Sequence, residues 1–303
     1  MIPLRHHVAA LVAVFLALAI GIALGGGLLG GDDDGDDRAE PASTSSAEPA
    51  PADDGQAEFA DAFVSEGAAR LYAGGLNGHA AAILALPGAE PAEVKALQAQ
   101  ILAAGGAITG TYAAGDKLMD PEERSSIDSL GTQLTGQLVD PRIEATAPTY
   151  ERLGQLLGVA MATTQATSVR ADLAAVSVRE SLAGAELLTS PADVRNAPLV
   201  LVVLPPGQEG AESSLATRTI LSGLASGIAH NAAGVVVVGD EDSADGGELA
   251  ALRESDLVGA ISTVDGVDTV LGQVTAVLAM QAVIGGTTGS FGASGSDGVV
   301  PLS

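Results

Sequence analysis

The sequence contains no cysteine and no tryptophan, and aromatic residues make up only 2% of its 303 residues. Without cysteine the chain forms no disulfide, has no thiolate nucleophile and offers no thiolate ligand to a metal. Because aromatic side chains are so few, the core has to be built from Ala, Val, Leu and Ile. The 39 glycines favour closely packed helices on a sheet, joined by many tight turns.

Basic residues are also scarce: 13 Lys and Arg stand against 38 Asp and Glu, which gives a net charge of −25. A general nucleic-acid binder needs a basic surface to neutralise phosphates, so this charge excludes that class. The same charge argues against docking on anionic lipid headgroups. We therefore expect no nucleic-acid partner.

One long apolar run, Val8–Leu29, reads VAALVAVFLALAIGIALGGGLL and carries no charge. As a helix with a rise of about 1.5 Å per residue, it is long enough to cross the hydrocarbon core of a membrane, which is about 30 Å thick. Arg5 precedes the run, and five aspartates follow it between residues 32 and 37. Since basic residues stay on the cytoplasmic side, we expect residues 1–7 in the cytoplasm, a single-pass membrane span over 8–29, and the rest in the cell envelope.

A cleaved signal peptide is the alternative interpretation of this run, with Ala23-Leu24-Gly25 as a small-residue cleavage site. The apolar part of a signal peptide is typically about 7–15 residues long, and this run is longer. Length therefore favours a retained signal anchor.

Small residues recur along the apolar run at a spacing of four, which places them on one ridge of a helix. A second helix backbone can approach closely along such a ridge, so it is a candidate face for a homo-oligomer. An Ala-rich chain also produces this spacing by chance. The residues are Ala9, Ala13, Ala17, Gly21 and Gly25. A single apolar helix has no polar lumen, so the run does not form a pore alone.

Residues 30–58 form an acidic segment rich in Pro, Ser and Gly, with ten acids, one Arg and no apolar periodicity. Such a composition cannot bury enough apolar surface to offset the entropy of ordering it. We predict a disordered linker that holds the following domain away from the membrane.

From residue 59 onward, short apolar runs alternate with helical patterns. The predicted strands are 79–86, 107–113, 199–204, 235–238 and 258–263. The predicted helices are 59–76, 91–104, 121–138, 149–164, 168–183, 212–232, 247–255 and 267–284. Continuous apolar strands that alternate with helices indicate a covered parallel sheet. We predict an α/β domain over 59–285, with an open, mostly parallel sheet in a three-layer, Rossmann-like or flavodoxin-like arrangement, and a flexible tail over 286–303.

Ligands of open parallel sheets bind at the carboxyl ends of the strands, and an acidic loop follows the predicted strand 235–238. Its hard oxygen ligands suit Ca²⁺ or Mg²⁺, although acidic turns after strands are also common as solvated loops. The acids are Asp240, Glu241, Asp242 and Asp245. Asp265 follows the last predicted strand, and His79 and His230 are weaker metal candidates that would have to converge in space.

Motifs of the common enzyme classes are missing. No phosphate-binding GxxxxGK[ST] or GxGxxG follows a strand, and no GxSxG nucleophile elbow is present. Ser222-Gly223 and Ser226-Gly227 lie inside a predicted helix, where their small size indicates close packing. We expect no enzyme activity, no catalytic residue and no bound cofactor.

Two stretches resemble the mycobacterial copper transporter B family of actinobacterial envelope proteins. They are MIPLRHHVAALVAVFLALAIGIALG at residues 1–25 and ISTVDGVDTVLGQVTAVLAMQ at residues 261–281. The runs LVLVVL and VVVVGD between them agree with the order of elements in the family. Relatives usually follow the span with a charged coiled coil, whereas this chain has the acidic linker at that position.

The resemblance implies a role in copper efflux or copper homeostasis, with copper as the transported ion. Copper prefers Cys, Met and His ligands, yet this chain has no Cys and its four methionines are isolated. If the chain moves copper, it does so through oligomers or partners. Similar actinobacterial proteins are implicated in cell separation, as partners of a second membrane protein that promote peptidoglycan hydrolase action. That role is the alternative.

Overall fold

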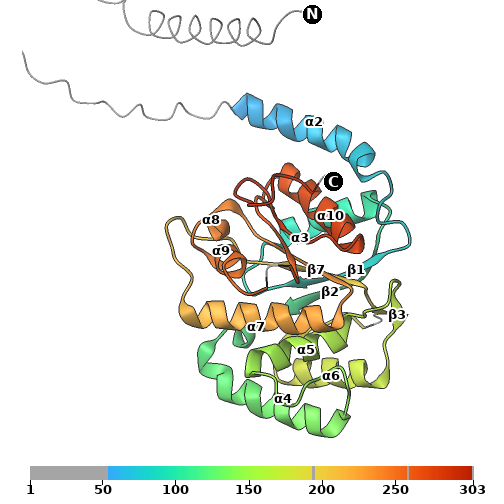
Figure 1. Cartoon of the computed structure of the whole chain (residues 1–303), viewed down its shortest axis with the longest axis vertical. Helices are drawn as coiled ribbons and strands as arrows, with labels where there is room; N and C mark the ends of the chain where they lie inside the picture. Colours follow the sequence, from blue (N-terminus) through green and yellow to red (C-terminus); the bar gives the residue numbers. More distant parts are fainter. Residues whose placement is uncertain (1–53, 193–194, 258, 302–303) are drawn as a thin grey trace, which may run out of the picture. The chain divides into compact units, whose positions relative to one another are not determined.

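The computed structural model describes residues 54–192, 195–257 and 259–301, and it confirms an α/β domain with a mostly parallel sheet (Figure 1). The sheet has seven strands in the order β4-β2-β1-β6-β7-β8-β9. These strands are β4 (Leu188–Thr189), β2 (Ala107–Ala114), β1 (Ala80–Ala85), β6 (Leu199–Val203), β7 (Gly234–Val238), β8 (Ser262–Val264) and β9 (Ser290–Phe291). All pairings are parallel except that of β4 with β2.

The five central strands β2-β1-β6-β7-β8 follow one another in the flavodoxin-like order, in which the first strand lies between the second and the third. The chain therefore reverses its direction of progress between β1 and β6. Both strands are short apolar runs whose residues alternate between the two faces of the sheet. Ile83 belongs to the core on one face, and its neighbours Ala82 and Leu84 belong to the core on the other.

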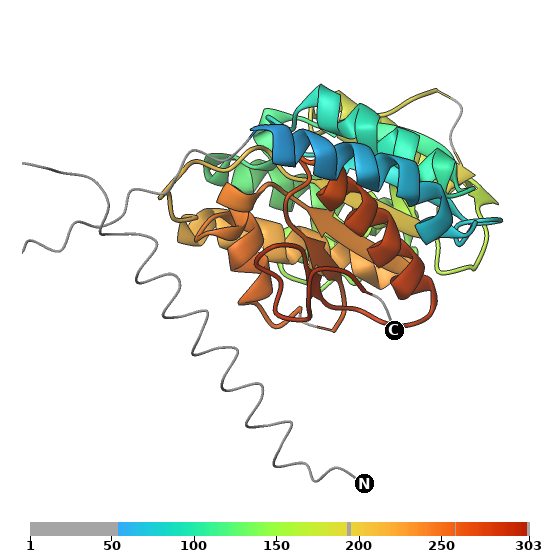
Figure 2. The same ribbon diagram turned by 90° about the horizontal axis from the view of Figure 1, so that it is seen from above.

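Helices cover both faces of the sheet. One face carries α2 (Asp54–Tyr72), α3 (Pro91–Ala103) and α10 (Val270–Ile284), which Figure 2 shows side by side. On the other face lie α4 (Arg124–Leu138), α5 (Thr149–Met161), α6 (Leu173–Gly184), α7 (Leu215–Asn231) and α9 (Glu248–Arg253). The short α8 (Glu241–Ala244) follows β7, and single 3₁₀ turns at Asp116–Leu118 and Pro121–Glu123 precede α4.

The helices α5 and α7 approach each other through glycine. A Cβ atom on Gly227 would lie 2.1 Å from the carbonyl oxygen of Glu151, and one on Gly154 would lie 2.4 Å from the carbonyl oxygen of Leu224. Gly223 has similarly close neighbours, with Tyr150 Cβ at 2.7 Å. The prediction that the Ser-Gly pairs of α7 serve close packing is therefore confirmed.

The predicted helix over 168–183 begins later than expected. Asp172 caps α6 by accepting a hydrogen bond of 2.8 Å from the Ala175 amide, so the predicted start of this helix at residue 168 is wrong. The residues before the cap form β3 (Val169–Arg170), which pairs with β5 (Arg195–Asn196) in a separate antiparallel ribbon.

Both ends of the domain extend beyond the predicted boundaries. The helix α2 begins at Asp54, inside the segment predicted as linker. At the other end, where a flexible tail is predicted over 286–303, Ser290–Phe291 joins the sheet as β9 beside β8. A two-residue strand gives no periodic signal, which is why the composition alone pointed to a tail.

The predicted membrane span 8–29, its small-residue face and the linker residues 30–53 lie outside the described residues. Within the part of the chain that the structure describes, no helix is both long and apolar enough to cross a bilayer.

Replacing Gly227 by Ala tests the glycine contact. The added Cβ would collide with the backbone of α5, so we expect Gly227→Ala to lower the free energy of unfolding by about 3 kcal/mol. Gly136, exposed on α4 with no atom near its missing Cβ, is the matched control. Gly136→Ala should raise stability by about 0.5–1 kcal/mol, because alanine favours a helix over glycine. Urea unfolding followed by circular dichroism measures both, and equal effects of the two changes would contradict the close contact.

Candidate functional site

Asp240, at the end of β7, uses its carboxylate to tie two loops together. One oxygen accepts a hydrogen bond of 2.8 Å from the Ser243 amide and so caps α8. Both oxygens also lie within hydrogen-bond distance of the Gly207 amide, at 2.9 and 3.0 Å, in the loop that follows β6. Gly207 is required there, since a Cβ would lie 2.2 Å from the Ser243 nitrogen. The side chain is thus a link between two strand ends.

The other acids of this loop do not join Asp240 around a common point. Glu241 and Asp242 occupy the first turn of α8 and are exposed, and Asp245 is exposed after the helix ends. Throughout the described ranges, no three His, Cys, Asp or Glu side chains gather in a way that could hold a metal ion. The acidic loop is therefore the solvent-exposed start of a short helix, and its carboxylates do not form a metal site in the described structure.

The two histidine candidates lie at the amino ends of the strands, at the opposite end of the sheet from the acidic loop. His79 is half-buried just before β1, and His230 is exposed in the last turn of α7, before β7 begins. Asp240 follows β7 instead. Since β1 and β7 run parallel, both histidines are separated from the acidic loop by the length of a strand.

The loops after β1 and β6 approach each other closely where the strand order reverses. Gly88 has a left-handed backbone, with φ of +86°, and its missing Cβ would lie 3.2 Å from Pro205 Cβ. The Pro205 loop is in turn held by Asp240 through Gly207. This is the position where folds of this strand order bind their ligands. A groove of about 640 Å³, which Gly88 helps to line, opens on the β2 side of this contact.

A second group of carboxylates meets at this edge. Glu93 is half-buried in the first turn of α3, where burial is the largest factor that raises its pKa. The negative charges of Asp268, Asp240 and Glu90 raise the pKa further. Glu90 and Glu93 both belong to the start of α3, whereas Asp240 follows β7 and Asp268 follows β8. The topology of the sheet is therefore needed to bring the acids of α3 near the other two.

Asp265, after β8, anchors the last segment of the domain. Its buried carboxylate accepts hydrogen bonds from the amides of Ala293 and Ser294, at 2.5 and 3.0 Å, and from the Ser294 hydroxyl. Arg253 Nη1 lies 3.1 Å from the same carboxylate, and Arg253 Nη2 donates to the Phe291 carbonyl at 2.8 Å. Sequence reasoning identified Asp265 and missed Arg253, which has no motif around it. Asp265 and Arg253 together hold residues 291–294 against the end of β8, which explains why β9 is part of the sheet.

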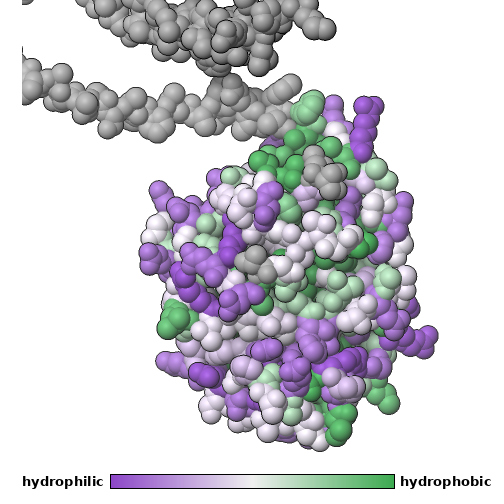
Figure 3. All heavy atoms as spheres, viewed as in Figure 1, coloured by the Kyte–Doolittle hydropathy of each residue, from purple (hydrophilic) through white to green (hydrophobic). Residues whose placement is uncertain are grey.

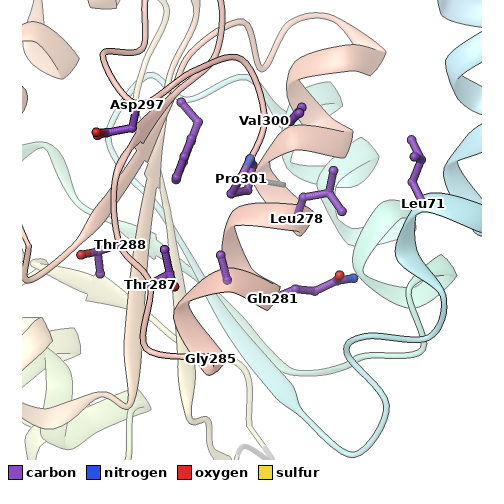
Figure 4. A pocket seen from close by; sticks show the side chains of 11 residues that line it. Leu71, Leu278, Gln281, Gly285, Thr287, Thr288, Asp297, Val300 and Pro301 are labelled. Atoms are coloured by element: carbon purple, nitrogen blue, oxygen red, sulfur yellow. The ribbon is translucent and has the colours of Figure 1, made fainter. Parts of the chain in front are cut away.

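Two grooves on the surface lie apart from the candidate acids. One, of about 640 Å³, runs between the ends of β1 and β2 and the start of α3, and Lys95 and Asp116 are among its lining residues. The other, of about 620 Å³, lies between α10 and the segment that ends at Pro301 (Figure 4). Leu71 of α2 contributes to it, and Figure 3 shows hydrophobic side chains gathered over α2. Neither groove is lined by His79, His230 or Asp240.

Neutralising Glu93 tests the acidic cluster. Because the pKa of Glu93 is raised in the folded state, its charge opposes folding at neutral pH, and stability is gained as the pH falls through the window above 4.5. We expect Glu93→Gln to stabilise the protein at pH 7 by about 0.5 kcal/mol after solvent screening, with no difference well below pH 4.

The control is Glu180→Gln, which removes an exposed carboxylate on α6. Denaturant unfolding at a series of pH values provides the measurement. A Glu93→Gln variant that is less stable than the parent at pH 7, or one that behaves like the control, would contradict the proximity of the acids.

Comparison with known proteins gives consistent matches. A family model described as "Copper transport outer membrane protein, MctB" matches residues 1–301. The "Copper transporter MctB" of Mycobacterium leprae is 28% identical over 238 residues, which cover 72% of this chain and 71% of the relative. The proteins of the same name from Mycobacterium tuberculosis and Mycobacterium bovis are each 27% identical over 314 residues, which cover 96% of both chains. The resemblance seen at both ends of the sequence is confirmed, and the chain belongs to the MctB family.

Proposed function

We propose that the chain is a membrane-anchored envelope protein that takes part in copper efflux and copper homeostasis without a conduction path of its own. The observation that carries this proposal is the family match over residues 1–301, which includes both the apolar run and the α/β domain. Relatives named as copper transporters align with the chain over nearly their whole length. In this proposal Val8–Leu29 is the anchor, residues 1–7 are cytoplasmic and the domain faces the envelope.

The side chains that copper prefers are used for other purposes in the domain. Met161 and Met280 are fully buried in the two cores, and Met119 packs against one of them. His79 and His230 lie on different elements, and Asp240 is occupied by two backbone amides. These positions support a role in which a partner or an oligomer supplies the copper path.

The alternative function is a non-enzymatic factor in cell separation, which binds a second membrane protein and promotes the action of a peptidoglycan hydrolase. The groove between α10 and the segment ending at Pro301 favours it, because Leu71, Phe291 and Val300 give this groove apolar walls suited to a protein partner. The groove adjoins α2, the helix that follows the linker.

Deletion of the gene separates the two roles. We expect the deletion strain to grow poorly at raised copper and to contain several-fold more copper, measured by mass spectrometry of washed cells. The full chain should restore growth, whereas a variant without residues 8–29 should not, because it lacks the anchor. Normal copper tolerance together with chains of unseparated cells would overturn the copper role and favour the alternative.

A further inference from the structure

A polar pocket lies near the amino ends of the central strands, at the opposite end of the sheet from the acidic loop. It has a volume of about 330 Å³ and lies where α5 and α7 end, beside the β3–β5 ribbon. Figure 1 shows β3 next to α5 and α6. The side chains around the pocket include two arginines, one carboxylate and several uncharged hydrogen-bonding groups, namely Arg142, Arg170, Asp172, Thr163, Asn196 and Asn231.

Arg142 is held in one orientation by carboxylates. Its Nε and Nη2 atoms bind the two oxygens of Asp140 at 2.9 and 2.6 Å, and Nη2 also lies 2.8 Å from Asp172. Neither interaction uses Nη1, so this edge of the guanidinium keeps two N–H donors. A fixed guanidinium with an unused edge is well suited to bind an oxyanion.

A second cation lies next to the pocket without a carboxylate partner. Arg170 and Arg195 are directly opposite in the antiparallel ribbon, so their side chains leave it on the same face. Like charges in this position repel each other. The Arg195 side chain donates to Ser168 at 2.7 and 3.2 Å, and within the described ranges the exposed side chain of Arg170 makes no hydrogen bond or ion pair. Two unneutralised guanidiniums therefore lie side by side in a chain whose net charge is −25.

The ends of α5 and α7 would by themselves favour a cation, because helix C-termini carry partial negative charge. At the end of α5 this negative charge is offset by hydrogen-bond donors. Asn196 Nδ2 donates to the carbonyl oxygens of Val159 and Ala162, at 2.9 and 2.8 Å. Arg179 donates to the carbonyl oxygen of Ala160 at 2.6 Å. Among the residues that line the pocket, two are arginines, Arg142 and Arg170, and one is a carboxylate, Asp172. The lining therefore carries a net positive charge, and Arg195 adds a further positive charge opposite Arg170.

We propose that this pocket binds a small oxyanion, a carboxylate or phosphate group, through the lining side chains of Arg142 and Arg170, with the charge of the neighbouring Arg195 adding to the attraction. A pocket of 330 Å³ also has room for a small organic molecule that carries this group. The anion would neutralise the facing arginines and so stabilise the β3–β5 ribbon. The inference stands independently of any role in copper transport.

Titration calorimetry on the full chain in nonionic detergent tests the proposal, with inorganic phosphate and acetate as probes and chloride at equal ionic strength as reference. We expect phosphate or acetate to bind measurably above chloride, and their ranking to identify the preferred oxyanion. Arg170→Ala should weaken that binding by about tenfold, as expected for the loss of a charge-assisted contact. The double variant Arg170→Ala/Arg195→Ala should abolish binding of the oxyanion.

Arg124→Ala is the matched control. Arg124 is also exposed, and in the part of the chain that the structure describes its side chain makes no hydrogen bond or ion pair. It lies at the start of α4, whereas Arg142 follows the end of that helix. Arg124→Ala should leave binding unchanged, and all variants should keep the thermal unfolding midpoint of the parent within a few degrees. Binding no stronger than that of chloride, or an equal loss in the Arg124→Ala variant, would overturn the proposal.

Discussion

The contact between the backbones of α5 and α7 is the constraint on which one whole face of the domain depends. Gly154 and Gly227 allow the two helices to touch without intervening side chains. Because α7 covers the sheet, this contact brings α5 into the core, and α4 and α6 pack against α5 in turn. Any side chain at the crossing would push that layer away from the strands.

The same contact sets the geometry at the ends of these helices. A Cβ on Gly158 would lie 2.7 Å from Asn231 Cβ, so the C-terminal turns are also close together. Asn231 donates hydrogen bonds of 3.0 Å to the carbonyls of Gln155 and Arg142. It thereby ties the chain that carries Arg142 to both helices. The position of the arginine pocket is thus a consequence of glycine packing some residues away.

Much of the fold could be predicted from the sequence, because strands such as 199–204 and 235–238 are buried on both faces and read as continuous apolar runs. Short elements could not. The strands β3, β4, β5 and β9 have two residues each, and their pairing depends on partners distant in the chain. The helix α6 begins after Asp172 and not at residue 168, because residues 169–170 pair with β5 in the ribbon.

The site was predictable in position but not in arrangement. The sequence placed Asp240 and Asp265 at strand ends, where the structure has them, yet the bond from the Gly207 amide to Asp240 joins loops that follow different strands. Glu93 and Asp268 become neighbours only through the strand order. Arg170 and Arg195 face each other because β3 pairs with β5, and two-residue strands cannot be predicted from a periodic pattern in the sequence.

Together with the proposed function, these observations lead to one account, in which the domain's own side chains hold no copper and the proposed role in copper handling is carried out through partners. The binding of Cu(I) and Cu(II) to the purified full chain, measured by equilibrium dialysis and metal analysis, tests it most directly. The account predicts no stoichiometric copper at micromolar free metal, and no change in the Asp240→Asn variant. One equivalent of tightly bound copper that is lost on changing Asp240, His79 or His230 would contradict it.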